Sequence, residues 1–271
     1  MDFGVRAHDI GCLSVEKLVE RLKEEGVKNA QLAIPRAIDG VDSFDKIDEH
    51  LCHEIHDSFK KNNINIAILS CYQDLSCLDE KQRIKAVDTF IKCLKFNKII
   101  GAGVVGTETS YDHLSRFEKH KRFTLMMDSL LRITEVANQE NIDFAIEPVS
   151  FHPLCDVETT LEVIDELKSS HVKVIFDLAN VLERPHEVNQ KAYFKRCFEL
   201  LNDKIAAIHL KDFDVDENGV YIPKKLGAGC MDYSELIRYI ESHPNVPVIR
   251  EELELNHKEE DKKFIMTMFK S

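Results

Sequence analysis

The sequence DFAIEP at residues 143–148 is followed by VKVIFD at residues 172–177. Each is a short apolar run that ends in a carboxylate, Glu147 in the first and Asp177 in the second. A polar stretch and then a helical pattern separate them, and the spacing of about 30 residues is the length of one βα unit. The pair therefore predicts two parallel strands joined by a crossover helix.

The same pattern recurs further along the chain. KIAAIHLKD at residues 204–212 and VPVIREE at residues 246–252 contain apolar runs that lead to His209 and Glu251. Because the carboxyl ends of parallel strands joined in this way meet at one rim of a barrel, we expect these polar side chains to converge there. Glu252 is the alternative to Glu251, and we prefer Glu251 because it follows the apolar run directly.

Apolar runs and helical patterns alternate along the chain. The predicted strands are residues 3–7, 30–34, 64–69, 99–105, 144–146, 172–176, 205–208 and 246–250. The predicted helices are residues 14–25, 43–61, 79–95, 116–139, 156–169, 191–201, 233–242 and 259–270, with Ser14, Asp79 and Asp156 as N-caps. This alternation predicts an α/β fold, a (β/α)8 TIM barrel, rather than an open doubly wound sheet. Without a Pro- or Gly-rich linker, we expect residues 1–271 to form a single domain.

The phase of the strands adds a chemical prediction. Strand alternation places Glu147 on the same face as Ala145, and His209 on the same face as Ala207. A buried carboxylate needs a counter-charge or an ion, and for a lone carboxylate an ion pair or a helix cap suffices. In-phase groups at successive strand ends instead predict one divalent metal ion, with the ligands Glu147, Asp177, His209 and Glu251. Such ligands suit Mn²⁺, Zn²⁺, Co²⁺ or Mg²⁺, and the sequence does not choose among them.

Composition restricts the partners. The chain has 271 residues, 44% of them hydrophobic, and a formal net charge of −12 without a basic block, which disfavours nucleic acid and anionic membranes as partners. No apolar run approaches the roughly 20 residues of a membrane helix. Eight cysteines without a CxxC pair, and an N-terminus that lacks a signal-peptide pattern, favour a cytoplasmic protein with reduced thiols.

Several short motifs are similar to a known family. In order and spacing, the strings VRAHD, VVGTET, IEP, FDLAN, IHLKDF, LGAG and PVIREE resemble the xylose-isomerase-like TIM-barrel superfamily, which includes sugar phosphate isomerases/epimerases and the AP endonuclease family 2. The resemblance covers nearly the whole chain. It implies that the shared metal ligands are Glu147, Asp177, His209 and Glu251, and that in epimerases the two glutamates also act as acid and base.

The sequence differs from two kinds of family member, endonuclease IV and the ketose 3-epimerases, at positions that those enzymes use. Endonuclease IV has further histidines for a trinuclear zinc site, whereas this chain reads ILSCYQ in the third unit, VVGTE in the fourth and Asn180 after Asp177. Endonuclease activity is therefore not expected. Ketose 3-epimerases carry substrate-binding groups where Pro153, Asn180 and Val215 stand here, so the same substrates are not implied.

Other polar residues near the predicted rim are candidates for substrate binding. Arg6 and His8 share a face of the first predicted strand; Arg6 suits a buried ion pair, and His8 either a substrate contact or a structural role in the loop. Lys211, in phase with His209, suits either an anionic substrate group or a salt bridge. The further candidates, from the loops after the fourth, fifth and sixth strands, are Thr107, Glu108, His152 and Asn180.

These observations predict a divalent-metal-dependent isomerase or epimerase of a small sugar or sugar phosphate, which works through an enediolate with Glu147 and Glu251 as catalytic acid and base. Two alternatives remain open: a lyase similar to inosose dehydratase, and a non-catalytic barrel that binds a metal and a sugar. The expected partner is a small molecule, and a homo-oligomer is possible. The sequence does not identify the substrate.

Overall fold

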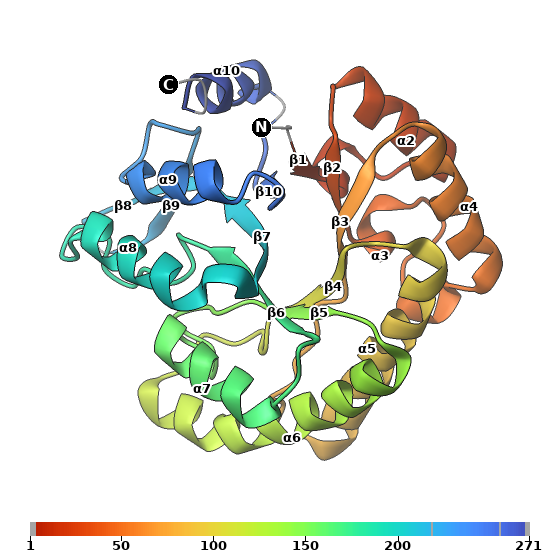
Figure 1. Cartoon of the computed structure of the whole chain (residues 1–271), viewed down its shortest axis with the longest axis horizontal. Helices are drawn as coiled ribbons and strands as arrows, with labels where there is room; N and C mark the ends of the chain where they lie inside the picture. Colours follow the sequence, from red (N-terminus) through yellow and green to blue (C-terminus); the bar gives the residue numbers. More distant parts are fainter. Residues whose placement is uncertain (1–3, 218, 255, 269–271) are drawn as a thin grey trace.

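The computed structural model describes residues 4–217, 219–254 and 256–268, and within them eight parallel strands close into a barrel (Figure 1). The strands are β1 (Gly4–Arg6), β2 (Asn29–Leu32), β3 (Asn65–Ser70), β4 (Val104–Thr107), β5 (Phe144–Ile146), β6 (Val172–Asp177), β7 (Ile205–Leu210) and β10 (Val248–Arg250). Strand β1 pairs with both β2 and β10, which closes the sheet. The predicted (β/α)8 TIM barrel is confirmed.

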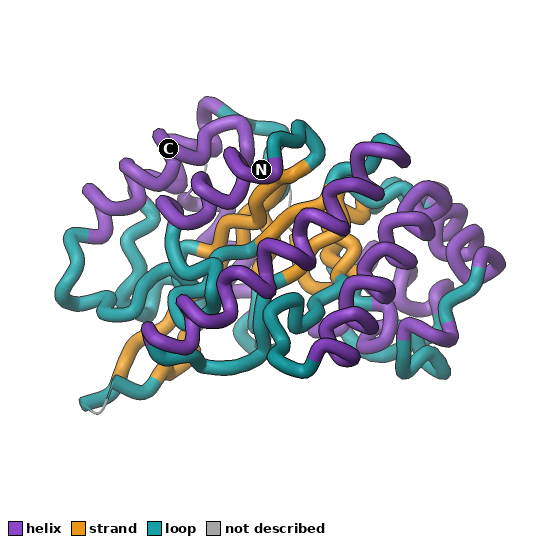
Figure 2. The backbone as a smooth tube through the Cα atoms, turned by 90° about the horizontal axis from the view of Figure 1, so that it is seen from below, coloured by secondary structure: helices purple, strands orange, loops and turns teal. Residues whose placement is uncertain are grey.

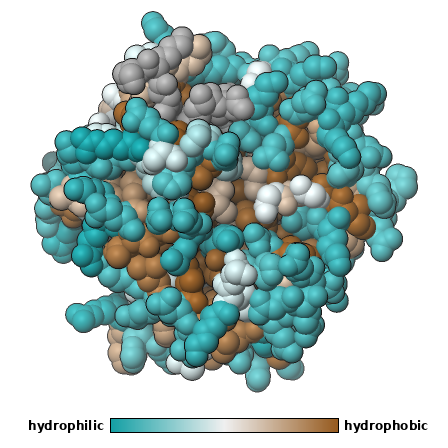
Figure 3. All heavy atoms as spheres, viewed as in Figure 1, coloured by the Kyte–Doolittle hydropathy of each residue, from teal (hydrophilic) through white to brown (hydrophobic). Residues whose placement is uncertain are grey.

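Helices surround the strands (Figures 1 and 2). They are α1 (Ala7–Ile10), α2 (Val15–Glu24), α3 (Ile34–Ala37), α4 (Glu49–Lys61), α5 (Glu80–Ile100), α6 (Arg116–Glu140), α7 (Val157–Leu167), α8 (Gln190–Leu201), α9 (Ser234–Ser242) and α10 (Lys258–Met268). Polar side chains cover much of the rim of the face seen in Figure 3, with apolar atoms between them toward the centre. Within the described residues, none of these helices combines the length and the apolar character that crossing a membrane requires.

Two of the predicted N-caps make the expected hydrogen bond. The carboxylates of Asp79 and Asp156 accept from backbone N–H groups in the first turns of α5 and α7. Ser14 occupies the N-cap position of α2, but within the described residues its side chain makes no capping hydrogen bond. These caps fix where α5 and α7 begin after the loops at the mouth of the barrel.

The fourth predicted strand was wrong in its position. Residues 99–100 form the last turn of α5, which ends at Gly101 with φ +76°, and the strand begins only at Val104. The Asn97 side chain bonds both the N–H and the carbonyl of Ala102, which fixes the turn after the helix. An apolar run alone does not distinguish a buried helix end from a strand.

Other predicted boundaries also differ. Strand β1 ends at Arg6, so His8 lies on α1 and does not share a strand face with Arg6; Phe3 lies outside the described residues. The predicted second strand loses its last residue to α3. The helix predicted for residues 43–61 is a 3₁₀ turn, Phe44–Lys46, followed by α4. Of the predicted last helix, residues 269–270 lie outside the described part.

An antiparallel hairpin interrupts the pattern after β7. Strand β8 (Asp212–Val215) pairs with β9 (Tyr221–Lys224), and the hairpin projects from one end of the barrel (Figure 2). This hairpin was not predicted from the sequence. The LGAG motif follows directly, and the Asp212 carboxylate accepts hydrogen bonds from the N–H groups of Gly227 and Gly229. These bonds join the motif to the first residue of the hairpin.

Candidate metal centre

The barrel interior sets the positions of the predicted metal ligands. Small and branched side chains fill the interior, and four of them are Ala145 on β5, Ile175 on β6, Ala207 on β7 and Ile249 on β10. Two residues beyond each of these, in the same phase of its strand, stands a predicted ligand: Glu147, Asp177, His209 and Glu251. Strand alternation therefore brings the four residues to the carboxyl end of the barrel interior.

The four side chains meet around the His209 ring. Nδ1 of His209 lies 3.3 Å from Glu147 Oε1, 3.5 Å from Glu251 Oε1 and 3.9 Å from Asp177 Oδ2. Glu147, Asp177 and His209 are at most 1% exposed. One potential ligand atom from each of these three residues lies within 4.8 Å of the other two, and Glu251 contacts the group through His209.

The donor set fits a divalent cation. Three carboxylates surround one imidazole, and buried carboxylates require compensation by positive charge. Two atoms of the cluster, Asp177 Oδ2 and His209 Nε2, are buried and have no hydrogen-bond partner within the described residues. Carboxylate oxygen and imidazole nitrogen are ligands that Mn²⁺, Co²⁺, Zn²⁺ and, for the oxygens, Mg²⁺ accept. Of the two glutamates left open by the sequence, Glu251 reaches His209, whereas Glu252 accepts a hydrogen bond from Tyr221.

Lys211 and Asn180 connect the acidic side chains. The Lys211 Nζ lies 2.9 Å from Asp177 Oδ2, although not in hydrogen-bonding geometry, and 3.3 Å from Glu251 Oε2. It also donates to Asn180 Oδ1 at 2.9 Å, and Asn180 Nδ2 donates to Glu147 Oε1 at 2.8 Å. The salt bridge that was one alternative for Lys211 is thus present in the structure.

Tyr72 is a residue of this cluster that the sequence analysis missed. Its hydroxyl donates to Glu147 Oε2 at 2.8 Å and accepts from Gln31 Nε2 at 3.2 Å. Gln31 also donates to Ser70 Oγ at 3.0 Å. Tyr72 follows β3 by two residues, in phase with Ser70, and this position in ILSCYQ was the available signal. Both oxygens of Glu147 are therefore held by neutral donors.

The cluster has a strongly negative field. Burial alone would lower the pKa of His209, but Glu251 and Glu147 raise it to about 9. Burial raises the pKa of Asp177 to about 6 although Lys211 opposes the shift. For Glu251, burial is outweighed by His209 and Lys211, which hold its pKa well below the usual range. The field that favours a proton on this imidazole also favours a bound cation.

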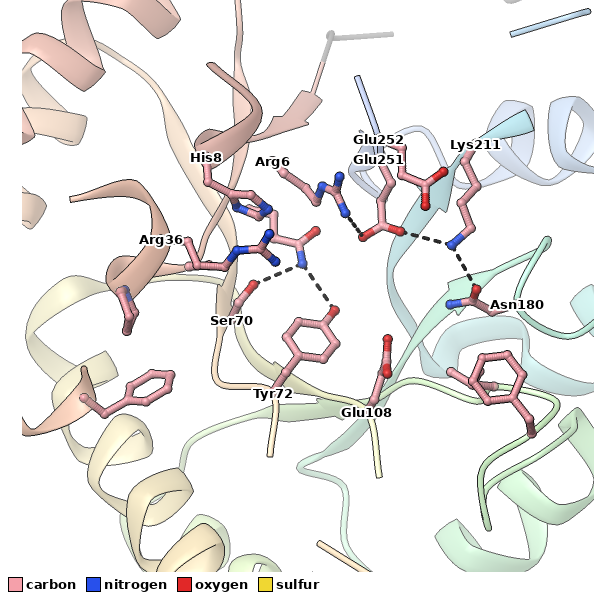
Figure 4. A pocket seen from close by; sticks show the side chains of 16 residues that line it. Arg6, His8, Arg36, Ser70, Tyr72, Glu108, Asn180, Lys211, Glu251 and Glu252 are labelled. Atoms are coloured by element: carbon pink, nitrogen blue, oxygen red, sulfur yellow. Dashed lines mark hydrogen bonds and ion pairs between the residues drawn. The ribbon is translucent and has the colours of Figure 1, made fainter. Parts of the chain in front are cut away.

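A cavity of about 330 Å³ adjoins the cluster, and Glu251 lines it (Figure 4). Four of the six predicted substrate contacts line it: His8, Glu108, Asn180 and Lys211. Thr107 is fully buried and is not one of the described lining residues. His152 is buried and is not one of the described lining residues; its Nδ1 lies 3.8 Å from Glu108 Oε2. Burial, together with the charges of Glu147 and Glu251, raises the pKa of Glu108 to about 8.

Arg6 lines the cavity beside Glu251. Its guanidinium donates two hydrogen bonds to Asp9 and lies 3.6 Å from Glu251 Oε1. It therefore makes the ion pair that was expected for it. Three of the lining residues also contact the acidic cluster: Tyr72, Asn180 and Lys211. They lie between the cavity and the carboxylates of Glu147 and Asp177.

A family model described as "Xylose isomerase-like TIM barrel" matches residues 14–261. The chain belongs to this family. The match spans the elements from α2 into α10, and thus contains every residue of the acidic cluster. A comparison with curated protein sequences finds no match.

Solved structures share the family's barrel. A D-tagatose 3-epimerase-like protein has a TM-score of 0.75 at 14% identity, with 99% of this chain and 97% of that one covered. A probable 3-DHS dehydratase involved in petrobactin synthesis in Bacillus anthracis has a TM-score of 0.74 at 17% identity, with 98% and 99% covered. A xylose isomerase-like protein from Mycobacterium smegmatis in complex with magnesium has a TM-score of 0.69 at 14% identity, with 94% and 87% covered. At these identities the similarity establishes the fold.

Proposed function

We propose that the protein is a divalent-metal-dependent isomerase or epimerase of a small sugar-like substrate. The observation that carries the proposal is the position of Glu147 and Glu251. In the barrel order, β5 and β10 lie on either side of the neighbouring strands β6 and β7, so the two carboxylates approach His209 from both sides. Two carboxylates placed in this way suit removal of a proton from a carbon and its return to another position or face.

The surrounding side chains suit this proton transfer. A divalent ion held by Glu147, Asp177, His209 and Glu251 would supply Lewis-acid polarisation of substrate oxygens. Tyr72 and Asn180 orient the two oxygens of Glu147, and Lys211 and Arg6 contact the two oxygens of Glu251. One glutamate would take the proton and the other would return it, while Lys211 and Asn180 would donate hydrogen bonds to substrate oxygens from the cavity wall.

A lyase is the second candidate. Removal of a proton next to a carbonyl group is common to isomerisation and to elimination of water, and the fold also occurs in a probable dehydratase. The small molecule, rather than a macromolecule, remains the expected partner, because the polar cavity of about 330 Å³ is of the size that suits a small ligand. A homo-oligomer and a cytoplasmic location stay predictions.

The test is a substrate screen in deuterated water. The purified protein, supplied with Mn²⁺ or Mg²⁺, is incubated with ketoses, their phosphates and sugar acids, and the products are analysed by mass spectrometry and NMR. An isomerase or epimerase gives a product of unchanged composition, with solvent deuterium on a carbon next to the carbonyl group. Loss of water identifies the lyase. Binding of a ligand without deuterium exchange or product would contradict both enzymes and leave the non-catalytic alternative.

A further inference from the structure

The cavity has a cationic end that the proposed proton transfer does not use. Figure 4 shows Arg36 and His8 on one side of the cavity, with Lys211 and Asn180 on the other. His8 comes from α1 and Arg36 from α3, two short helices that directly follow β1 and β2. Both residues therefore belong to the same mouth of the barrel as the acidic cluster, but to its opposite half.

Arg36 is available to bind an anion. Its guanidinium forms no hydrogen bond or ion pair with any described residue, in contrast to Arg6 and Lys211, which are both paired with carboxylates. The side chain points into the cavity beside Ser70 (Figure 4). A guanidinium offers donors in a planar fork that matches a carboxylate or a phosphate group. An anion could therefore bind to Arg36 without breaking an existing ion pair.

His8 provides a second, independent indication of a ligand at this end. Its side chain is 9% exposed, and neither ring nitrogen has a hydrogen-bond partner within the described residues. The acid beside it, Asp9, lies 3.8 Å from His8 Nε2 and is already bonded to Arg6. Burial and the charges of Arg6 and Arg36 lower the pKa of His8 to about 4, so near neutral pH the ring is uncharged and has one N–H to donate. Buried polar atoms are usually hydrogen-bonded, and a ligand would satisfy these.

We propose that Arg36 and His8 bind an anionic group, a phosphate or a carboxylate, at the end of the substrate that is remote from the reacting carbons. This inference rests on the proposed function, because it assigns the substrate of that site to the anionic sugars. Arg6 lies between this end and Glu251, and its positive charge shields an anion from the acidic cluster. Gln31 also lines the cavity, and its buried Oε1, which has no hydrogen-bond partner among the described residues, could accept a hydrogen bond from a hydroxyl of the same ligand.

The test compares three forms of one sugar. Binding of D-fructose, D-fructose 6-phosphate and D-fructuronate to the Mg²⁺-supplied protein is measured by calorimetry for the wild type, Arg36→Gln, His8→Asn and Arg116→Gln. Arg116 lies at the start of α6, outside the cavity, so Arg116→Gln makes the same charge change as a control. We expect the wild type to bind one anionic form at least about 10-fold more tightly than D-fructose, and which form it prefers distinguishes phosphate from carboxylate.

We expect Arg36→Gln to weaken that anionic form by about 10- to 100-fold and D-fructose by less than about 2-fold, since the lost interaction involves charge. His8→Asn should also weaken binding of the anionic form more than binding of D-fructose, but by a smaller factor. Arg116→Gln should change neither affinity. The proposal is overturned if the wild type shows no preference for either anion, if Arg36→Gln keeps the preference, or if Arg116→Gln reduces it equally. The readout is binding, so a protein that keeps this preference but gives no product and no deuterium exchange in the substrate screen would contradict the proposed function alone.

Discussion

The two halves of the cavity differ in how their polar groups are paired. On the side of β5, β6, β7 and β10, the carboxylates, His209 and Lys211 contact one another in one buried cluster. On the side of β1 and β2, Arg36 has no ion pair with a described residue and the His8 ring has no hydrogen bond. The acidic side concentrates negative charge in one place. The side of β1 and β2 keeps hydrogen-bond donors that are free to bind a ligand. The difference suggests chemistry at one end and recognition at the other.

The largest expected effect comes from the acidic side. Glu147→Gln keeps an oxygen at the same position but removes the proton-carrying carboxylate, so turnover should fall at least ~10²-fold while the protein stays folded. Steady-state assays on the substrate from the screen measure this, with circular dichroism as the check on folding. Glu158→Gln, at an exposed glutamate on α7, is the control and should be active. Full activity of Glu147→Gln would remove its role in proton transfer.

A smaller effect is expected for Tyr72, which holds Glu147. Tyr72→Phe removes a hydrogen bond to a charged group and should reduce kcat by about 10-fold, because such bonds contribute about 1.5–3 kcal/mol. The KM should change little, because we assign Tyr72 to positioning. Tyr193→Phe makes the same change on α8 and should have no effect. A KM effect without a kcat effect would assign Tyr72 to substrate binding instead.

Binding of a divalent ion should also stabilise the fold. At a free concentration of 100 times Kd, the ion should add about 2.7 kcal/mol to the free energy of unfolding. For a chain of this size this corresponds to a rise in Tm of roughly 5–10 °C. Thermal unfolding with and without Mn²⁺ measures the shift, and a chelator should reverse it. Arg36→Gln, on the other side of the cavity, should keep the full shift; if it does not, the two sides are not independent.

The smallest expected effect is a loss of stability as the pH falls. Burial lowers the pKa of both His8 and His152 to about 4. Between pH 6.5 and pH 4 the unfolded chain binds a proton that the folded histidine does not, so the free energy of unfolding falls as the pH falls. Each residue should contribute about 1 kcal/mol of this loss between pH 6.5 and pH 5, after allowance for partial exposure. In urea unfolding, the free energy of unfolding of His152→Asn should depend less on pH than that of the wild type. An equal dependence would show that His152 does not contribute to the loss of stability in acid.

The acidic side was predictable from the sequence, whereas on the other side only Arg6 and His8 were named as candidates. Glu147, Asp177, His209 and Glu251 follow the period of two within strands, and this period alone brings them to one rim. Tyr72 was missed because its role depends on the reach of a long side chain across the barrel to Glu147. Arg36 lies on the four-residue helix α3, which was not predicted and whose first residue, Ile34, was assigned to the end of the second strand. Short helices of this kind have too few residues to show a period.

The fourth strand shows the same limit. The apolar residues 99–100 read as the start of a strand, yet they end α5, and only the side chain of Asn97 and the left-handed Gly101 fix where the chain turns. The barrel itself was nevertheless predictable, because it depends on the number and order of the units rather than on their exact boundaries.

The most direct test of the central claim is the metal content of Asp177→Asn. Asp143→Asn is the matched control, because it makes the same change just before β5, at the opposite end of the barrel from the cluster. After incubation with Mn²⁺ and gel filtration, elemental analysis should find one ion per chain in the wild type and in Asp143→Asn, and almost none in Asp177→Asn. Equal metal content in Asp177→Asn and the wild type, or no bound ion in the wild type, would contradict the assignment of a metal centre to this cluster.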